Sequence, residues 1–282
     1  MARRIILHIG SPKCGSTYLQ RVMLKNAQSL LSKGIYYPHS DDSHPGNAAD
    51  LAEIDAQGLA DLFPKGVHTA VLSHEDLYGL AKRGDPLSEL IKGTDITVQL
   101  LAFLRPFSEF VFGDYSQFMK QHFHRFLAER NPYDGRDFET FAMRRIQNLR
   151  PAKFFMNWGK RFPEHPIVLD HYSKIRPVLE NLLGVGVVED WNIMDHQTNR
   201  SLRMEDCDRI AAAMRDPSCS EDTIRAMYHD AYHNTDVNDI GRSPERITWL
   251  EDQFKPQIQG LLKNFNYGNR LQHAPTRTQT GS

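Results

Sequence analysis

The feature that most constrains this chain is a short apolar run that leads through a glycine-bearing loop into a helical pattern. Residues 5–9 are branched and apolar apart from one histidine, which is typical of a buried parallel strand. A glycine stands at each end of the loop 10–15, and from Ser16 apolar residues recur at helical spacing until Gly34, where a left-handed cap is expected. This order of strand, loop and helix predicts an α/β fold built on a parallel sheet.

The same alternation continues along the chain. Three more strand-like runs lie at Val67–Ser73, Ile96–Leu104 and Ile167–Leu169. Helical patterns lie at 86–92, 107–130 and 138–160, and dominate after Ser173, where Ser243 and Pro244 predict one helix start. Residues 35–66 predict a long connection that holds a short helix near 48–62. We therefore expect one three-layer unit with a central parallel sheet flanked by helices.

Length and composition fit one folded domain. A chain of 282 residues suits a single α/β domain, which we place at 1–268, and the polar segment 269–282 is expected to be a disordered tail. A formal net charge of −1 gives no general attraction to nucleic acid. The first apolar run is too short for a signal peptide or a membrane span, and three scattered cysteines fit reduced thiols. These features predict a cytoplasmic protein with no nucleic-acid partner and no membrane span, and they leave its oligomeric state open.

The first loop has the properties of an anion site. A loop between a strand and a helix offers backbone N–H groups and the positive end of the helix dipole. Gly10 and Gly15 permit a tight backbone path, while Lys13, Ser16 and Thr17 add side-chain donors. In the standard nucleotide-triphosphate loop a lysine directly precedes the Ser/Thr. Here a glycine takes that place and the lysine lies earlier, which argues against an ordinary ATPase or GTPase.

This loop resembles that of a known family. The sequence Pro12-Lys13-Cys14-Gly15-Ser16-Thr17 resembles the 5′-phosphosulfate loop of P-loop sulfotransferases, and the flanking His8-Ile9-Gly10 and Leu19-Gln20 resemble the bacterial branch related to carbohydrate sulfotransferases. The resemblance implies a P-loop NTPase-like fold. It also implies 3′-phosphoadenosine 5′-phosphosulfate (PAPS) as sulfuryl donor, its bisphosphate (PAP) as product, and no metal. It makes residues 13–17 donor-binding and gives Lys13 the task of stabilising the leaving phosphate. Weaker landmarks extend the resemblance to about residue 205.

A second anion site is expected for the 3′-phosphate of such a donor. Arg105 follows a predicted strand, and ligands of parallel sheets gather at the carboxyl ends of strands. Leu104-Arg105-Pro106, continuing into Tyr115-Ser116-Gln117, resembles the family's 3′-phosphate motif. The family usually carries a serine eight positions after the arginine, where this chain has Gly113. A backbone N–H, or Ser116 from one turn later, would have to replace that hydroxyl.

The general base is expected at the end of another predicted strand. His74 and Glu75 follow the run that ends at Ser73, and either side chain could take a proton. Cytosolic sulfotransferases carry a histidine here, whereas the bacterial branch often has a Ser-Glu pair. Alternating side-chain directions predict that only one of the two faces the acceptor, and a near-neutral imidazole slightly favours His74. His44, in the long connection, is a third candidate.

Two other classes of protein are compatible with parts of this pattern. A P-loop kinase or NTPase would need a magnesium-binding carboxylate after a strand, for which Asp76 or Asp170 is the candidate. A catalytically idle protein would bind the nucleotide without turnover. For the sulfotransferase, the acceptor expected is a hydroxyl, less readily an amine, of a small molecule or saccharide.

Overall fold

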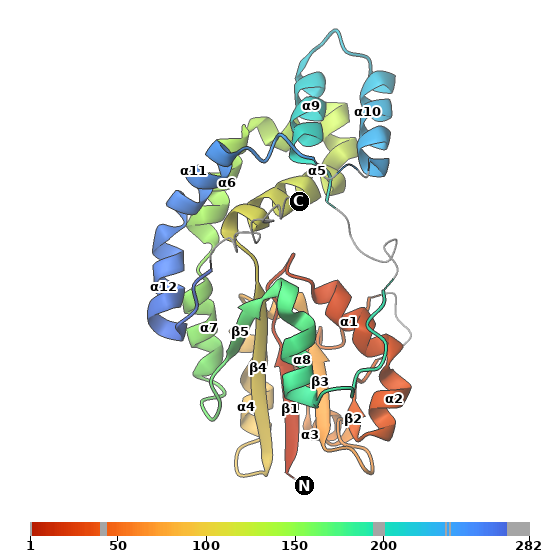
Figure 1. Cartoon of the computed structure of the whole chain (residues 1–282), viewed down its shortest axis with the longest axis vertical. Coiled ribbons are helices and arrows are strands. Elements are labelled where there is room, and N and C mark those ends of the chain that lie inside the picture. Colours follow the sequence, from red (N-terminus) through yellow and green to blue (C-terminus); the bar gives the residue numbers. More distant parts are fainter. Residues whose placement is uncertain (1, 40–43, 194–200, 235, 237, 270–282) are drawn as a thin grey trace, which may run out of the picture.

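The computed structural model describes residues 2–39, 44–193, 201–234, 236 and 238–269. Its centre is an all-parallel sheet of five strands in the order β2-β3-β1-β4-β5 (Figure 1). The strands are β1 (Arg3–His8), β2 (Ile35–Tyr36), β3 (Thr69–Ser73), β4 (Ile96–Leu104) and β5 (Val168–His171). Helices flank this sheet, so the predicted α/β architecture is confirmed. Most of the predicted tail, 270–282, lies outside the described residues.

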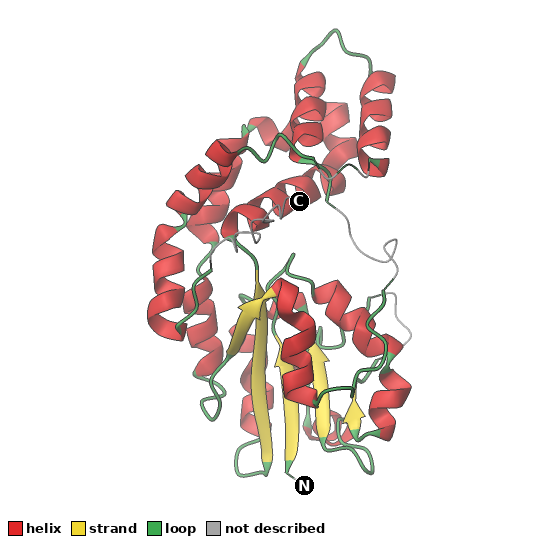
Figure 2. Ribbon diagram, viewed as in Figure 1, coloured by secondary structure: helices red, strands yellow, loops and turns green. Residues whose placement is uncertain are grey.

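Helices make up most of the remaining chain (Figure 2). Those in the first half are α1 (Ser16–Lys25), α2 (Ala27–Ser32), α3 (Ala56–Asp61), α4 (Asp85–Leu90) and α5 (Phe107–Glu129). Those in the second half are α6 (Phe138–Asn148), α7 (Pro151–Gly159), α8 (Ile175–Leu183), α9 (Met204–Arg215), α10 (Glu221–His233), α11 (Pro244–Gln253) and α12 (Lys255–Phe265). None of the helices in the described ranges is long and apolar enough to cross a membrane.

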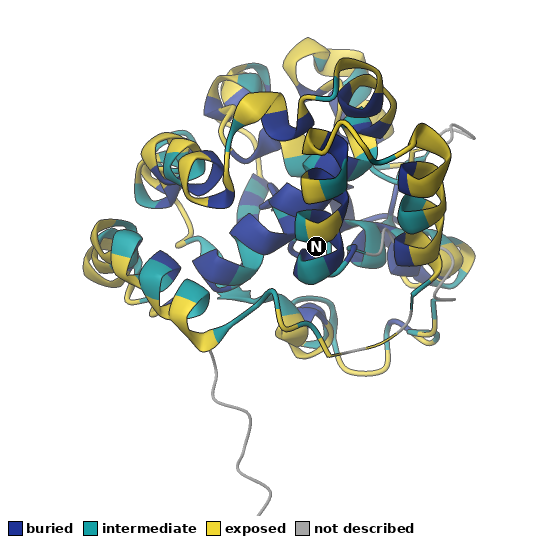
Figure 3. Ribbon diagram, turned by 90° about the horizontal axis from the view of Figure 1, so that it is seen from above, coloured by how far each residue is buried: buried dark blue, intermediate teal, exposed yellow. Residues whose placement is uncertain are grey.

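Alternation along the strands divides the buried apolar residues between two faces of the sheet. Ile6 packs in a cluster with residues of α1, α2 and α8, whereas its neighbours Ile5 and Leu7 belong to a larger cluster on the opposite face. That larger cluster runs from the sheet through α5 to α9, α11 and α12. Figure 3 shows the matching pattern in the helices, which bury their inner sides and expose their outer sides. Both faces of the sheet are therefore covered, as a parallel sheet requires.

The structure divides two helices that the sequence predicted as continuous. The first breaks at Asn26, whose amide donates to Val22 O at 2.9 Å and whose carbonyl accepts from the backbone N–H of Glu189 at 3.1 Å. The stretch 138–160 breaks before Pro151, because proline lacks an N–H and disfavours the helical conformation of the preceding residue. Strand β2 was not predicted, since its two residues are too few for a periodic pattern.

Arg105 and Pro106 connect β4 to helix α5, and a distant residue caps that helix. Pro106 occupies the N-cap position and has no side-chain donor or acceptor to offer. Glu251 of α11 supplies the cap, because its carboxylate accepts from the backbone N–H of Ser108 at 2.9 Å and from its hydroxyl at 2.5 Å. The predicted start of α11 is confirmed by the Ser243 hydroxyl, which accepts from Arg246 N at 3.3 Å. These contacts fix the direction in which α5 leaves the sheet.

Candidate active site

The loop after β1 takes a tight path that only small residues allow. Gly10 has φ 97°, and a Cβ there would lie 2.9 Å from Glu75 O. Gly15 has φ 83°, and a Cβ there would lie 2.5 Å from the side chain of Ile175. Gly15 is also the N-cap residue of α1, and it has no side chain that could accept a hydrogen bond from the first backbone N–H groups of the helix. The first N–H groups of α1 are consequently available to an anion at this point.

A cavity of about 730 Å³ opens at the carboxyl ends of the strands. Its walls come from the loop after β1 and the start of α1, the residues that follow β3 and β4, α5, the segment from β5 into the start of α8, and Ser201. The lining residues are Pro12, Lys13, Gly15, Ser16, Thr17, Tyr18, Glu75, Asp76, Arg105, Gln121, Tyr172, Ser173, Ile175, Arg176 and Ser201. The volume and the mixture of cations with aromatic rings suit a nucleotide-sized anion.

Most residues predicted to bind the donor lie on this cavity. Lys13, Gly15, Ser16 and Thr17 line it. Cys14 does not, because its thiol is buried in the core beneath the loop and lies 3.1 Å from the Ser11 hydroxyl. Burial raises the pKa of this thiol, and the nearby guanidinium of Arg105 opposes that effect. Cys14 thus packs the loop onto the sheet, and only its backbone remains available to a ligand.

Lys13 and Arg105 approach each other across the cavity. Burial lowers the pKa of Lys13, the carboxylates of Asp114 and Glu75 act to raise it, and Arg105 acts to lower it. A Cβ built on Gly113 would lie 3.6 Å from Nη1 of Arg105 and 4.0 Å from Cβ of Lys13. The two predicted anion sites are therefore neighbours, and α5 passes them both at Gly113.

Arg105 rests on an aromatic ring. Its guanidinium lies 4.5 Å from the ring centroid of Tyr172, and its buried Nε has no hydrogen-bond partner among the described residues. Ser116, the predicted substitute for the missing serine, is buried and accepts a hydrogen bond from Leu202 N at 2.6 Å. Ser116 is not among the residues that line the cavity, so its hydroxyl does not replace the missing serine there.

Of the three residues expected as candidates for the base, Glu75 is the one that lines the cavity. Its Oε2 accepts a hydrogen bond from Gln20 at 3.0 Å, and its Oε1 lies 3.5 Å from Nε2 of His44. Burial acts to raise the pKa of Glu75, but the hydrogen bond from Gln20 and the nearby imidazoles of His74 and His44 hold it below its ordinary value. The carboxylate is therefore ionised and can take a proton.

Ring nitrogens of His74 and His44 accept hydrogen bonds from backbone N–H groups. Nδ1 of His74 accepts from the N–H of Asp76 at 3.2 Å, and Nδ1 of His44 accepts from the N–H of Gly46 at 3.0 Å. The rings stack with centroids 5.0 Å apart. A neutral imidazole has one unprotonated nitrogen, and here that nitrogen is already an acceptor in both rings. Neither histidine presents a free lone pair to a substrate.

Several cavity residues were not singled out as site residues from the sequence. Tyr172 and Arg176 follow β5, so the rule that ligands gather at carboxyl ends of parallel strands would have pointed to them. Gln20 lies on α1, where no sequence pattern connects it with the end of β3.

Of the two carboxylates expected to bind magnesium in a kinase or NTPase, Asp76 lines the cavity and Asp170 does not. The Asp170 carboxylate accepts from the backbone N–H of His171 at 2.7 Å.

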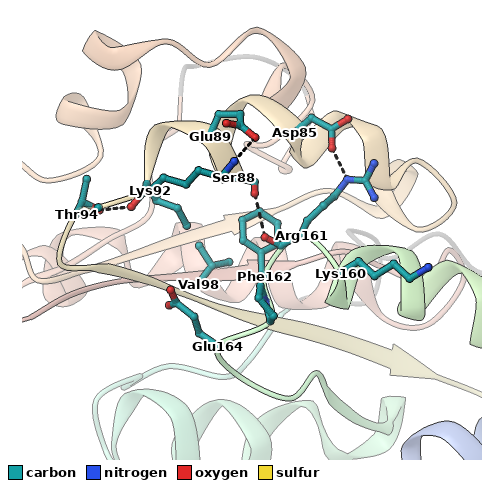
Figure 4. Close-up of a pocket in the computed structure, with 13 residues that line it drawn as sticks. Asp85, Ser88, Glu89, Lys92, Thr94, Val98, Lys160, Arg161, Phe162 and Glu164 are labelled. Atoms are coloured by element: carbon teal, nitrogen blue, oxygen red, sulfur yellow. Dashed lines mark hydrogen bonds and ion pairs between the residues drawn. The ribbon is translucent and has the colours of Figure 1, made fainter.

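A second cavity, of about 620 Å³, lies away from these strand ends (Figure 4). It is lined by α4, the start of β4 and the segment that follows α7. Two ion pairs engage four of its charged groups: Asp85 lies 2.5 Å from Arg161, and Glu89 lies 2.6 Å from Lys92. This cavity lacks the glycine-bearing loop between a strand and a helix that lines the first cavity.

Comparison with protein-family models, curated proteins and solved structures found no match to this chain. The residues of the first cavity combine the loop predicted to bind an anion, an arginine at a neighbouring strand end and an ionised carboxylate.

Proposed function

We propose that this chain is a sulfotransferase that moves the sulfuryl group of PAPS to a hydroxyl acceptor, less readily an amine, on a small molecule or saccharide. The observation that supports the proposal is that two cationic side chains, Lys13 of the loop and Arg105 just after β4, line one nucleotide-sized cavity. A donor with a 5′-phosphosulfate and a separate 3′-phosphate needs two such sites. The strand order, with the loop between β1 and α1, supports a P-loop NTPase-like fold.

In this proposal the loop binds the phosphosulfate. The N–H groups at the start of α1 and the ammonium of Lys13 face the phosphate that leaves with PAP. Arg105, held against Tyr172, binds the 3′-phosphate with charge-assisted hydrogen bonds. The cavity holds the donor so that the sulfur faces the carboxyl end of β3.

Transfer then requires one bond to form and one to break. The acceptor oxygen attacks sulfur, the bond from sulfur to the 5′-phosphate oxygen breaks, and the acceptor proton passes to Glu75. We assign the base to Glu75 rather than His74, because the lone pair of His74 is already used by the N–H of Asp76. The products are the sulfated acceptor and PAP, whose new charge Lys13 neutralises.

Donor binding without metal is the direct test. We expect PAP to bind the wild-type chain in the presence of EDTA, since Lys13 and Arg105 supply the positive charge. Arg105→Ala should weaken PAP binding by about 10- to 100-fold, the usual value of lost charge-assisted hydrogen bonds, and should weaken adenosine 5′-phosphate much less. Isothermal titration calorimetry with both nucleotides gives the comparison.

Three outcomes would contradict this proposal or part of it. Equal losses for both nucleotides would remove Arg105 from the 3′-phosphate site. Magnesium-dependent ATP hydrolysis, with no binding of PAP, would favour a kinase or NTPase instead. An idle nucleotide-binding protein would bind PAP and never transfer sulfate from labelled PAPS in a screen of saccharides, phenols and lipid alcohols.

Gly113→Ser should tighten PAP binding by about 2- to 10-fold, because it adds one hydroxyl beside Arg105. The new Cβ would lie 3.6 Å from the guanidinium, which is ordinary van der Waals contact. Serine should also stabilise α5 by about 0.5 kcal/mol relative to glycine. Gly113→Ala is the matched control, since it adds Cβ without the hydroxyl. A gain in affinity as large for alanine as for serine would assign the effect to helix stability.

A further inference from the structure

A buried glutamine connects the phosphate-loop helix with the proposed base. Gln20, on α1, is fully buried. Its Nε2 lies 3.0 Å from Oε2 of Glu75 and 3.2 Å from the hydroxyl of Ser73, at the end of β3. A primary amide has two N–H donors, so both contacts can be hydrogen bonds at once. Gln20 therefore connects the Glu75 carboxylate to Ser73, at the end of β3, through two hydrogen bonds.

The Ser73 hydroxyl also connects Gln20 to a buried histidine of β1. The Ser73 hydroxyl accepts from Gln20 and has one hydrogen to give, and Nδ1 of His8 lies 2.8 Å away. Burial lowers the pKa of His8 to about 4, while Glu75 opposes the shift, so this imidazole is neutral near pH 7. A buried chain of polar contacts thus runs from Gln20 through Ser73 to His8.

The reverse orientation of the amide is disfavoured. Turning Gln20 would bring its Oε1 against the ionised carboxylate of Glu75, and two acceptors would then face each other. It would also remove the donor to Ser73. The network consequently holds an N–H of Gln20 toward Glu75.

We propose that Gln20 is a positioning residue that keeps Glu75 ionised and oriented toward the acceptor hydroxyl. This inference rests on the proposed transfer reaction. Gln20 does not line the cavity, so it acts through Glu75 and not on the substrate. Because Gln20 lies seven positions after Lys13 on the same loop-helix unit, it also couples the position of the base to that of the donor loop.

Gln20→Met tests this role, since methionine keeps the length of the side chain and removes both donors. We expect kcat to fall by up to about 10²-fold, the cost of a misplaced catalytic group, while PAP affinity stays near native. The acid limb of the kcat profile should move to higher pH, because Glu75 stays partly buried and loses its hydrogen bond from Gln20. Gln57→Met is the matched control. Gln57 also donates to a carboxylate, Asp61 at 2.7 Å, but on exposed α3.

A second measurement needs no activity. In protein labelled with ¹³C at glutamate Cδ, the Glu75 signal is identified by its loss in Glu75→Gln, and its pKa should rise in Gln20→Met. A purely structural role would lower thermal stability and leave both this pKa and the pH profile unchanged, which would overturn the inference. Failure of the wild type to bind PAP or transfer sulfate would instead count against the proposed function, and the NMR titration would still test the contact.

Discussion

Glu75→Gln is expected to lower kcat by about 10²- to 10⁴-fold at saturating PAPS, the range usual for a lost general base. The amide is nearly isosteric with the carboxylate but takes no proton. PAP affinity should change little, because Glu75 is assigned to the acceptor side of the reaction. The acceptor identified with labelled PAPS serves as the second substrate for these measurements.

The matched variant is His74→Ala, for which we expect a much smaller loss of kcat. If His74→Ala gives the larger loss, the imidazole is the base and its hydrogen bond to Asp76 N breaks during turnover. If both variants keep near-native kcat, the proton acceptor belongs to the loop that carries His44. The comparison therefore separates all three candidates.

The pH dependence follows from the lowered pKa of Glu75. A carboxylate acts as a base only while it is ionised, so kcat falls when the pH drops through this pKa. Because the pKa lies below the ordinary glutamate value, the plateau of kcat should extend to lower pH than for an exposed glutamate. A histidine base would lose activity at much higher pH, near the ordinary imidazole pKa of about 6.5.

Lys13→Ala is expected to lower kcat by about 10²- to 10³-fold, because the ammonium stabilises the charge that develops on the leaving phosphate. The substitution keeps Cβ at a position with φ 62°, so the loop conformation is retained. Thermal unfolding should therefore be near native. Single-turnover transfer from labelled PAPS measures the chemical step.

Lys65→Ala is the control for this loss, since Lys65 is an exposed loop lysine remote from the cavity. A Lys13→Ala protein with native kcat would remove the loop from the catalytic assignment. A protein that loses only PAP affinity, with kcat intact, would restrict Lys13 to ground-state binding. Each result is read against the unfolding temperature, which reports the fold independently.

Local patterns predicted much of the architecture. The apolar runs that became β1, β3 and β4 are periodic over enough residues to be recognised, and the glycines at 10 and 15 mark the loop between β1 and α1. Strand β2 was not predicted, because two residues are too few to show a periodic pattern, although pairing with β3 stabilises the strand. The break at Asn26 likewise depends on the backbone of residues 189–190, far away in the chain.

The sequence by itself determined which residues reach the carboxyl edge of the sheet, because parallel strands deliver the residues that follow them to one edge. Lys13, Glu75 and Arg105 were placed in this way. Tertiary structure decided how those residues are engaged. In the folded chain, Nδ1 of His74 accepts from a backbone N–H, and the amide of Gln20 donates to the Glu75 carboxylate. Such choices depend on hydrogen bonds between segments far apart in sequence, whose distances no local pattern encodes.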